Sequence, residues 1–139
     1  MEDIMHPVRE LIDSLSVHAA LDSETLARVI DALSGCEEAV TACAAGMLAA
    51  RDVDRMRTSV LCDLDCADVV ATTRRLLTRA TADDSTLIAA QLEACLLACR
   101  RSEEQCRLTA PVHEHCRLCT AATHGAAEAC RRALDALRG

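Results

Sequence analysis

Hydrophobic positions recur along most of the chain at alternating intervals of four and three residues. This spacing is typical of helices that bury one stripe of side chains, and no segment sustains the period-two alternation of a strand. Polar joints interrupt the pattern at 21–23, 51–54, 82–85 and 109–111. We therefore expect a short leading helix over residues 7–20 and four long helices near 23–50, 53–80, 85–108 and 111–137.

The joints between the long helices are short enough to make neighbouring helices antiparallel. Asp22 and Asp52 are N-cap candidates for the helices that follow them. Pro111 suits the first turn of the last helix, where a missing N–H costs nothing. The sequence predicts an all-α fold in a single domain of residues 1–139. Within it, we expect an antiparallel up-down-up-down four-helix bundle over 22–138, preceded by the short leading helix.

Composition and charge exclude several classes of function. The chain has 139 residues, ten cysteines, no aromatic residue and a net charge of −7, which argues against nucleic-acid binding. Its longest uncharged stretch, 39–50, is well short of the roughly 18 residues of a membrane span. The N-terminus is acidic and leads into no apolar segment, so we expect a cytoplasmic protein whose cysteines stay reduced. No catalytic motif is visible, and we expect no enzymatic activity.

The cysteines follow the same spacing of four and three, so we expect them on the buried stripe of every long helix. The stripes run through Cys36, Val40, Cys43 and Met47; Cys62, Cys66, Val69, Thr73 and Leu76; Cys95, Cys99, Ser102 and Cys106; and Val112, Cys116, Cys119, Thr123, Ala126 and Cys130. Charged residues between the stripes, Glu103 among them, are expected on solvated faces.

Chain direction places most of these thiols at one end of the bundle. Aliphatic residues precede the cysteines on the first and third long helices and follow them on the second and fourth. An antiparallel arrangement therefore gathers the cysteines beside the joints at 51–54 and 109–111, which we call the mouth end. Cys130 is the exception, and we expect it at the depth of Ile88 and Leu92.

A thiol-lined core can hold soft metal ions. Cysteines four residues apart, such as Cys62 and Cys66, have Cβ atoms about 5–6 Å apart, too far for a disulfide but suitable for sulfurs that share an ion. Thiolates select Cu(I), Zn²⁺ or an iron–sulfur cluster. Cu(I) fits best, because it accepts two or three sulfurs and can share them, whereas Zn²⁺ requires closed sets of four. A redox cluster, a structural zinc site and a core of inert thiols remain alternatives.

Further soft or borderline ligands also gather at the mouth end. Met47 lies on a buried stripe, and His113 and His115 lie near the start of the last helix. Thioether and imidazole groups there could pass Cu(I) inward by ligand exchange. The same residue types are also common as core filler and as solvated helix starts, so both interpretations remain open.

The His-x-His-Cys-x-x-Cys motif at 113–119, the Ala-Glu-Ala-Cys-Arg-Arg segment at 127–132 and the Cys-x-x-x-Cys pairs at 62/66 and 95/99 resemble the cysteine-lined four-helix-bundle copper storage proteins. The resemblance covers about residues 30–132 and implies a cytosolic homotetramer that stores or buffers Cu(I). It implies ten cysteine ligands: Cys36, Cys43, Cys62, Cys66, Cys95, Cys99, Cys106, Cys116, Cys119 and Cys130. Cysteines common in that family are replaced here at Val40, Met47, Val69, Thr73, Ser102, Thr123 and Ala126, so we expect a lower capacity.

Overall fold

The computed structural model describes residues 7–14, 20–80 and 82–139, and all regular structure within them is helical. The α-helices are α1 (Pro7–Ser14), α2 (Ser23–Leu48), α3 (Arg57–Thr78), α4 (Ser85–Thr109) and α5 (Glu114–Arg138). Two short 3₁₀ helices, η1 (Val53–Met56) and η2 (Ala82–Asp84), precede α3 and α4. The all-α prediction is confirmed.

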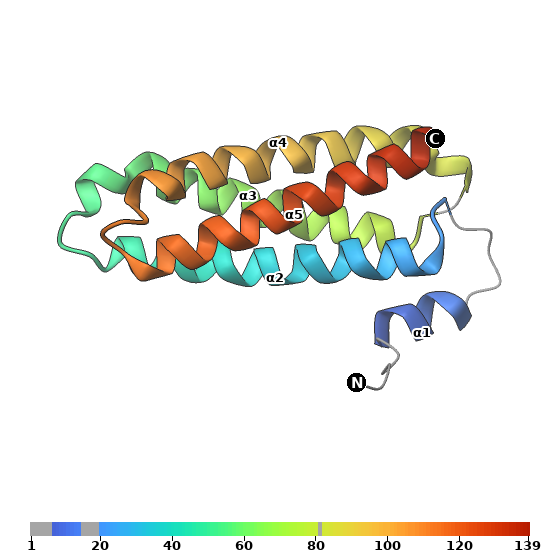
Figure 1. The fold of residues 1–139 in the computed structure, drawn as a ribbon, viewed down its shortest axis with the longest axis horizontal. Helices are drawn as coiled ribbons and strands as arrows, with labels where there is room; N and C mark the ends of the chain where they lie inside the picture. Colours follow the sequence, from blue (N-terminus) through green and yellow to red (C-terminus); the bar gives the residue numbers. More distant parts are fainter. Residues whose placement is uncertain (1–6, 15–19, 81) are drawn as a thin grey trace.

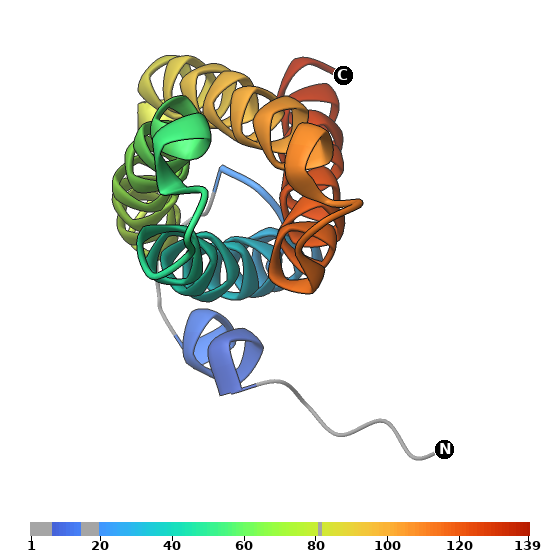
Figure 2. The ribbon, with the colours of Figure 1, turned by 90° about the vertical axis from the view of Figure 1, so that its left-hand side faces the viewer.

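The four long helices run antiparallel to their neighbours along one axis (Figure 1). Viewed along that axis they form a ring, in which α2 and α4 each lie between α3 and α5 (Figure 2). The short helix α1 lies outside the ring against α2 and buries Ile12. The predicted four-helix bundle with a short leading helix is confirmed, and the part of that leading helix expected at 15–19 lies outside the described residues.

The joints differ in how they begin the next helix. Asp22 is the N-cap of α2, as predicted, and its carboxylate accepts hydrogen bonds from the Thr25 N–H at 2.8 Å and the Thr25 hydroxyl at 2.9 Å. Asp52 occupies the N-cap position of η1, as predicted, but its side chain makes no capping hydrogen bond. The Asp52 carboxylate instead lies 3.3 Å from Nε2 of His113, so it joins two connections at the mouth end.

Helix α5 begins at Glu114, and the predicted start at residue 111 is wrong. The N–H groups of Val112 and His113 donate to the Thr109 carbonyl, so Pro111 lies in a turn that closes α4. His113 has an extended backbone, and its carbonyl accepts the N–H of Cys116, which is the first bond of the new helix. As a result Val112 is 73% exposed and lies off the buried stripe.

The predicted stripes are confirmed on α2 and α4 and, from Cys116 onward, on α5, where they are buried through the thiol-bearing layers. On α3 every second residue of the predicted stripe lies off the interior face, so the prediction is wrong at those positions. The interior positions there are Ser59, Asp63, Cys66, Val70, Thr73 and Leu77. Val69 and Leu76 are only half-buried, because the helix is rotated so that their successors in the sequence face the core.

Glu103 is only 8% exposed, so its predicted place on a solvated face is also wrong. Arg107 donates to its carboxylate, and Nδ1 of His124 lies 3.1 Å from the same oxygen, so its charge is paired at the bundle surface. None of the described helices is both long and apolar enough to cross a membrane.

Candidate metal centre

All ten cysteines lie in described segments, are buried and carry free thiols. Nine of them form two groups inside the ring of helices. The outer cluster, toward the mouth end, consists of Cys43, Asp63, Cys106, His115, Cys116 and Cys119. The inner cluster consists of Cys36, Cys66, Cys95, Cys99 and Cys130.

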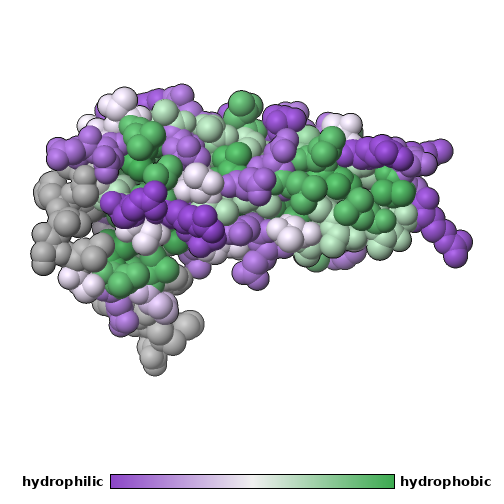
Figure 3. Space-filling model, turned by 180° about the vertical axis from the view of Figure 1, so that it is seen from behind, coloured by the Kyte–Doolittle hydropathy of each residue, from purple (hydrophilic) through white to green (hydrophobic). Residues whose placement is uncertain are grey.

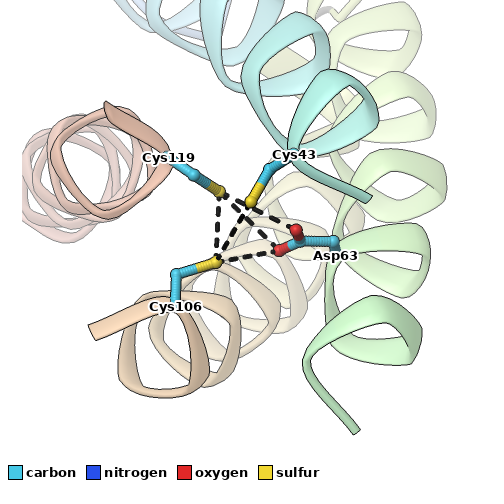
Figure 4. Close-up of side chains that lie close together, drawn as sticks. All are labelled: Cys43, Asp63, Cys106 and Cys119. Atoms are coloured by element: carbon cyan, nitrogen blue, oxygen red, sulfur yellow. Dashed lines mark hydrogen bonds between the residues drawn. The ribbon is translucent and has the colours of Figure 1, made fainter. Parts of the chain in front are cut away.

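The centre of the outer cluster takes one side chain from each long helix (Figure 4). Cys43, Asp63, Cys106 and Cys119 come from α2, α3, α4 and α5, and their ligand atoms lie within 4.8 Å of one another. The Cys106 sulfur lies 3.3 Å from the Cys119 sulfur and 4.0 Å from the Cys43 sulfur. Three thiols and a carboxylate thus converge on a single buried point.

Asp63 is fully buried, which is costly for a carboxylate unless it is neutral or compensated. Burial raises its pKa to about 7, against the opposing effect of the hydroxyl of Ser102, which donates to Oδ1 at 2.6 Å. The Cys106 thiol donates to the same oxygen at 3.3 Å. Near neutral pH this carboxyl is therefore poised between an acid and a negatively charged ligand.

His115 and Cys116 extend the outer cluster toward the mouth end. The Nδ1 atom of His115 lies 3.4 Å from the Cys43 sulfur and 3.5 Å from the Cys116 sulfur, and the two sulfurs are 3.6 Å apart. His115 is half-buried while Cys43 and Cys116 are buried. One imidazole nitrogen and two thiols therefore form a second set of convergent ligands, which shares Cys43 with the first.

The remaining candidates at the mouth end have different surroundings. The His113 ring stacks on the His115 ring, with centroids 5.1 Å apart and an interplanar angle of 27°, and its Nε2 faces Asp52. Met47 and Met56 are both buried at this end of the bundle. The ring of His113 therefore supports the ring of His115, and the polar contact of its Nε2 atom is with the carboxylate of Asp52.

The inner cluster is built from thiols alone. The Cys66 sulfur lies 3.9 Å from the sulfurs of both Cys36 and Cys99. The neighbouring thiols of Cys130 and Cys99 lower the pKa of Cys95, so Cys130 lies near a thiol. Cys130, expected at the depth of Ile88 and Leu92, therefore also has a thiol for a neighbour.

Hydrogen bonds between the inner thiols also redistribute their acidity. The pKa of Cys36 is lowered by its interactions with the thiols of Cys66, whose sulfur lies 3.9 Å away, and of Cys99. The pKa of Cys99 is raised, because ionising it would break its hydrogen bonds to those neighbours. One thiol in such a group can thus ionise first, and this favours the arrival of a first cation.

Non-thiol side chains lie between the two clusters along the helices. Val40 lies between Cys36 and Cys43 on α2, Ser102 between Cys99 and Cys106 on α4, and Thr123 between Cys119 and Cys130 on α5. All three are fully buried. The hydroxyl of Thr123 donates to the Cys119 carbonyl, whereas that of Ser102 donates to Asp63 and not to its own helix. The column of thiols is therefore interrupted near its middle.

Cys62 is the one cysteine that the structure does not bring into either cluster. Its thiol is buried on the α4 side of α3, where Arg101 donates to the sulfur at 3.6 Å. Burial raises the pKa of this thiol, although the charge of Arg101 acts in the opposite direction. Because α3 turns Asp63 into the core, Cys62 lies one position away from the interior stripe.

Two residues of this site were not predicted from the sequence: Asp63 as a potential ligand, and Ser102 as the hydrogen-bond donor to its carboxylate. A signal for Asp63 exists: Ser59, Asp63, Cys66, Val70, Thr73 and Leu77 also keep the spacing of four and three. This alternative stripe puts a carboxylate in the core, which is unfavourable unless a partner such as Ser102 compensates it.

Comparison with known proteins agrees with this geometry. The sequence model of the family described as "Csp: Copper storage protein" matches residues 22–135. The copper storage protein Ccsp from Streptomyces lividans, in a structure loaded with 10 copper equivalents, is 33% identical, with a TM-score of 0.89 over 93% of this chain and 98% of that chain.

Two further structures from the same organism are similar. A cytosolic copper storage protein with five coppers is 36% identical, with a TM-score of 0.79 over 81% of this chain and 93% of that chain. A histidine-to-alanine variant of Ccsp is 34% identical, with a TM-score of 0.82 over 86% of this chain and 99% of that chain. No curated protein sequence matches the chain significantly. The family match over most of the chain, together with these structures, shows that the chain belongs to the copper storage protein family.

Proposed function

We propose that this protein stores Cu(I) in the cytosol, bound by the thiols of the outer and inner clusters, without catalysing a reaction. One observation carries the proposal: nine buried free thiols line the interior of a single four-helix bundle, and seven of them belong to convergent sets of potential ligands. A soft cation with low coordination number matches such a set, because each sulfur can be shared between two ions. The cytosolic setting is supported by the relative that is described as cytosolic.

Loading is a proton exchange. Each thiol that binds Cu(I) loses its proton from the core as the Cu–S bond forms, and net charge within the site is conserved where shared sulfurs make this one proton for each Cu(I). Before loading, neutral thiols pack as small apolar groups. Leu26, Leu33, Ile88 and Leu92, all fully buried, form a conventional core toward the other end, and this stabilises the bundle when it holds no copper.

The proposed ligands follow the geometry. Cys43, Cys106, Cys116 and Cys119, with Asp63 and Nδ1 of His115, bind the first ions near the mouth end. Cys36, Cys66, Cys95, Cys99 and Cys130 bind ions deeper in the bundle. Met47 and His113 assist transfer at the mouth end, and Cys62 stays outside the ligand set.

Self-association is a further part of the proposal. The face opposite that of Figure 1 carries apolar side chains within a mixed surface (Figure 3). Leu61 and Leu64 of α3 and Leu97 of α4 are 61%, 43% and 62% exposed. Burying them against further copies of the chain would remove this apolar surface from water. We propose a homotetramer, as the resemblance implies.

Anaerobic titration with Cu(I) in competition with a strong chelator tests the storage function. We expect several tightly bound ions per chain and a colourless protein, and native mass spectrometry then gives ion identity, ion number and oligomeric state together. Fewer than two tightly bound Cu(I) ions per chain would contradict storage. A brown protein with visible absorption would indicate an iron–sulfur cluster, and preferential retention of Zn²⁺ would indicate a zinc site.

A further inference from the structure

Gly46 lies where α2 passes the imidazole of His115. A Cβ atom at this position would lie 3.0 Å from both Cδ2 and Nε2 of the ring and 3.2 Å from Cε1. Contacts this short require one of the two groups to move. The ring of His115 therefore occupies space that any residue other than glycine would fill at position 46.

The other two glycines inside the long helices lack such a neighbour. A Cβ atom at Gly35, on α2, or at Gly125, on α5, would meet nothing within 4 Å. Glycine is a poor helix former, second only to proline, because its backbone loses the most freedom on folding. Gly46 is thus the helical glycine at which a close approach explains the absence of a side chain.

The approach at Gly46 determines where the opposite side of the ring points. The ring atoms near Gly46 are Cδ2, Nε2 and Cε1, whereas Nδ1 lies at hydrogen-bond distance from the sulfurs of Cys43 and Cys116. Cys43 precedes Gly46 by three residues on α2, so both lie on the same side of that helix. The missing side chain and the thiol of Cys43 therefore face the same imidazole.

Other contacts limit where the ring could move. Its stacking partner His113 is held by Asp52 at 3.3 Å, and His115 itself stands in the first turn of α5, next to Cys116. A ring displaced from α2 by a methyl group would therefore carry Nδ1 away from the two sulfurs.

We propose that Gly46 is a positioning residue for copper uptake: it lets the imidazole of His115 lie against α2 with Nδ1 directed at Cys43 and Cys116. The inference rests on the proposed storage function and specifies how its outermost ligand set is aligned. It concerns the rate at which Cu(I) is captured, because the inner cluster does not contact this ring in the described residues.

The test compares five proteins: wild type, Gly46→Ala, Gly35→Ala, His115→Ala and the double variant Gly46→Ala/His115→Ala. Stopped-flow measurement under anaerobic conditions gives the rate of Cu(I) transfer from a Cu(I)–chelator complex. We expect Gly46→Ala to slow transfer by about threefold or more, toward the rate of His115→Ala, because the ring must give by a few tenths of an ångström and rates depend steeply on the placement of a reacting group. Gly35→Ala should load at the wild-type rate, and the double variant should load no more slowly than His115→Ala alone.

Crystal structures of the copper-free wild type, Gly46→Ala and Gly35→Ala provide a readout that does not depend on copper. We expect Nδ1 of His115 to move beyond hydrogen-bond distance from the Cys43 sulfur only in Gly46→Ala. A ring that stays in place in Gly46→Ala overturns the inference, as does a displaced ring with unchanged transfer rate. Slower loading of the double variant than of His115→Ala also overturns it, because Gly46 would then act without the imidazole. Failure of storage is distinguishable, because it would appear as absent copper binding in the wild type itself.

Discussion

The hydroxyl of Ser102 donates a hydrogen bond of 2.6 Å to the carboxylate of Asp63 in the fully buried interior of the bundle. Each residue occupies a stripe position where a thiol would otherwise fit, and each makes the other acceptable there. The carboxylate gives the hydroxyl a partner other than its own helix, and the hydroxyl partly compensates the loss of hydration of the carboxylate. The pair thus introduces one hard oxygen ligand among soft sulfurs.

The raised pKa of Asp63 predicts how the stability of the copper-free protein depends on pH. In the unfolded chain this carboxyl ionises at its ordinary value of 3.8, and in the folded chain at about 7. Between these values the folded state binds one more proton than the unfolded state, so the contribution of Asp63 to stability falls as pH rises from about 4 to about 7, by up to about 1.4 kcal/mol per pH unit.

Asp63→Asn removes this titration while keeping the shape and the acceptor for Ser102. We expect the unfolding free energy of the wild type, measured by urea denaturation at several pH values, to decrease relative to that of Asp63→Asn across this range. Ser102→Ala, which removes the hydrogen bond that opposes the rise of the pKa, should extend the upper end of the range to higher pH. A constant difference between wild type and Asp63→Asn from pH 4 to pH 7 would show that this carboxyl is already ionised at pH 4.

Two cysteines of similar burial should differ in their effect on copper capacity. The Cys106 sulfur contacts two thiols and the carboxylate of the outer cluster, whereas the Cys62 thiol contacts Arg101 outside it. We expect Cys106→Ser to bind about one or two fewer Cu(I) ions per chain than the wild type, and Cys62→Ser to bind the same number. Chelator competition with native mass spectrometry measures both. Equal losses in the two variants would mean that Cys62 reaches the ligand set when copper binds.

Much of this arrangement could be predicted from the sequence, because the spacing of four and three on α2, α4 and most of α5 admits only one buried stripe. Helix α3 was ambiguous for a physical reason. Cys66 and Thr73 belong to both possible stripes, and the alternatives exchange Val69 for Val70 and Leu76 for Leu77, which are equally apolar. At these positions hydrophobicity does not distinguish the two stripes, and between Cys62 and Asp63 it favours the wrong residue for the core. Packing against α4, which supplies Ser102 as a partner, decides it.

The mouth end was ambiguous for another reason. His113 and His115 are equivalent in a sequence pattern, and both were plausible metal ligands. Their roles separate only because α5 begins at Glu114, which leaves His113 in the connection beside Asp52 and turns His115 toward Cys43. The space at Gly46 depends on how α2 and α5 pack, and no local signal in the sequence records it.

The interruption between the clusters predicts a gain in capacity. Val40 is fully buried between Cys36 of the inner cluster and Cys43 of the outer cluster. Val40→Cys places a thiol in this gap with little change of volume, and we expect about one additional Cu(I) ion per chain. Val29→Cys, the same substitution at a buried position of α2 among aliphatic residues, is the control and should leave capacity unchanged. Unchanged capacity in Val40→Cys as well would show that the existing thiols already bridge the gap.

The aliphatic end of the bundle should govern stability without affecting copper. Leu33 is fully buried on α2, one turn from Cys36 on the side away from the mouth end. Leu33→Ala leaves a cavity and should lower the unfolding free energy of the copper-free protein by about 2–5 kcal/mol. Leu87→Ala, at a leucine of α4 that is 55% exposed, should change it by less than about 0.5 kcal/mol.

Urea denaturation measures both values, and titration of the folded variants should give the wild-type number of Cu(I) ions, because neither leucine contributes a ligand. Bound copper should also recover stability in Leu33→Ala, since an ion that binds only the folded state shifts the equilibrium toward it. A Leu33→Ala protein that is folded yet binds fewer ions would mean that the thiol layers depend on the aliphatic layers for their alignment.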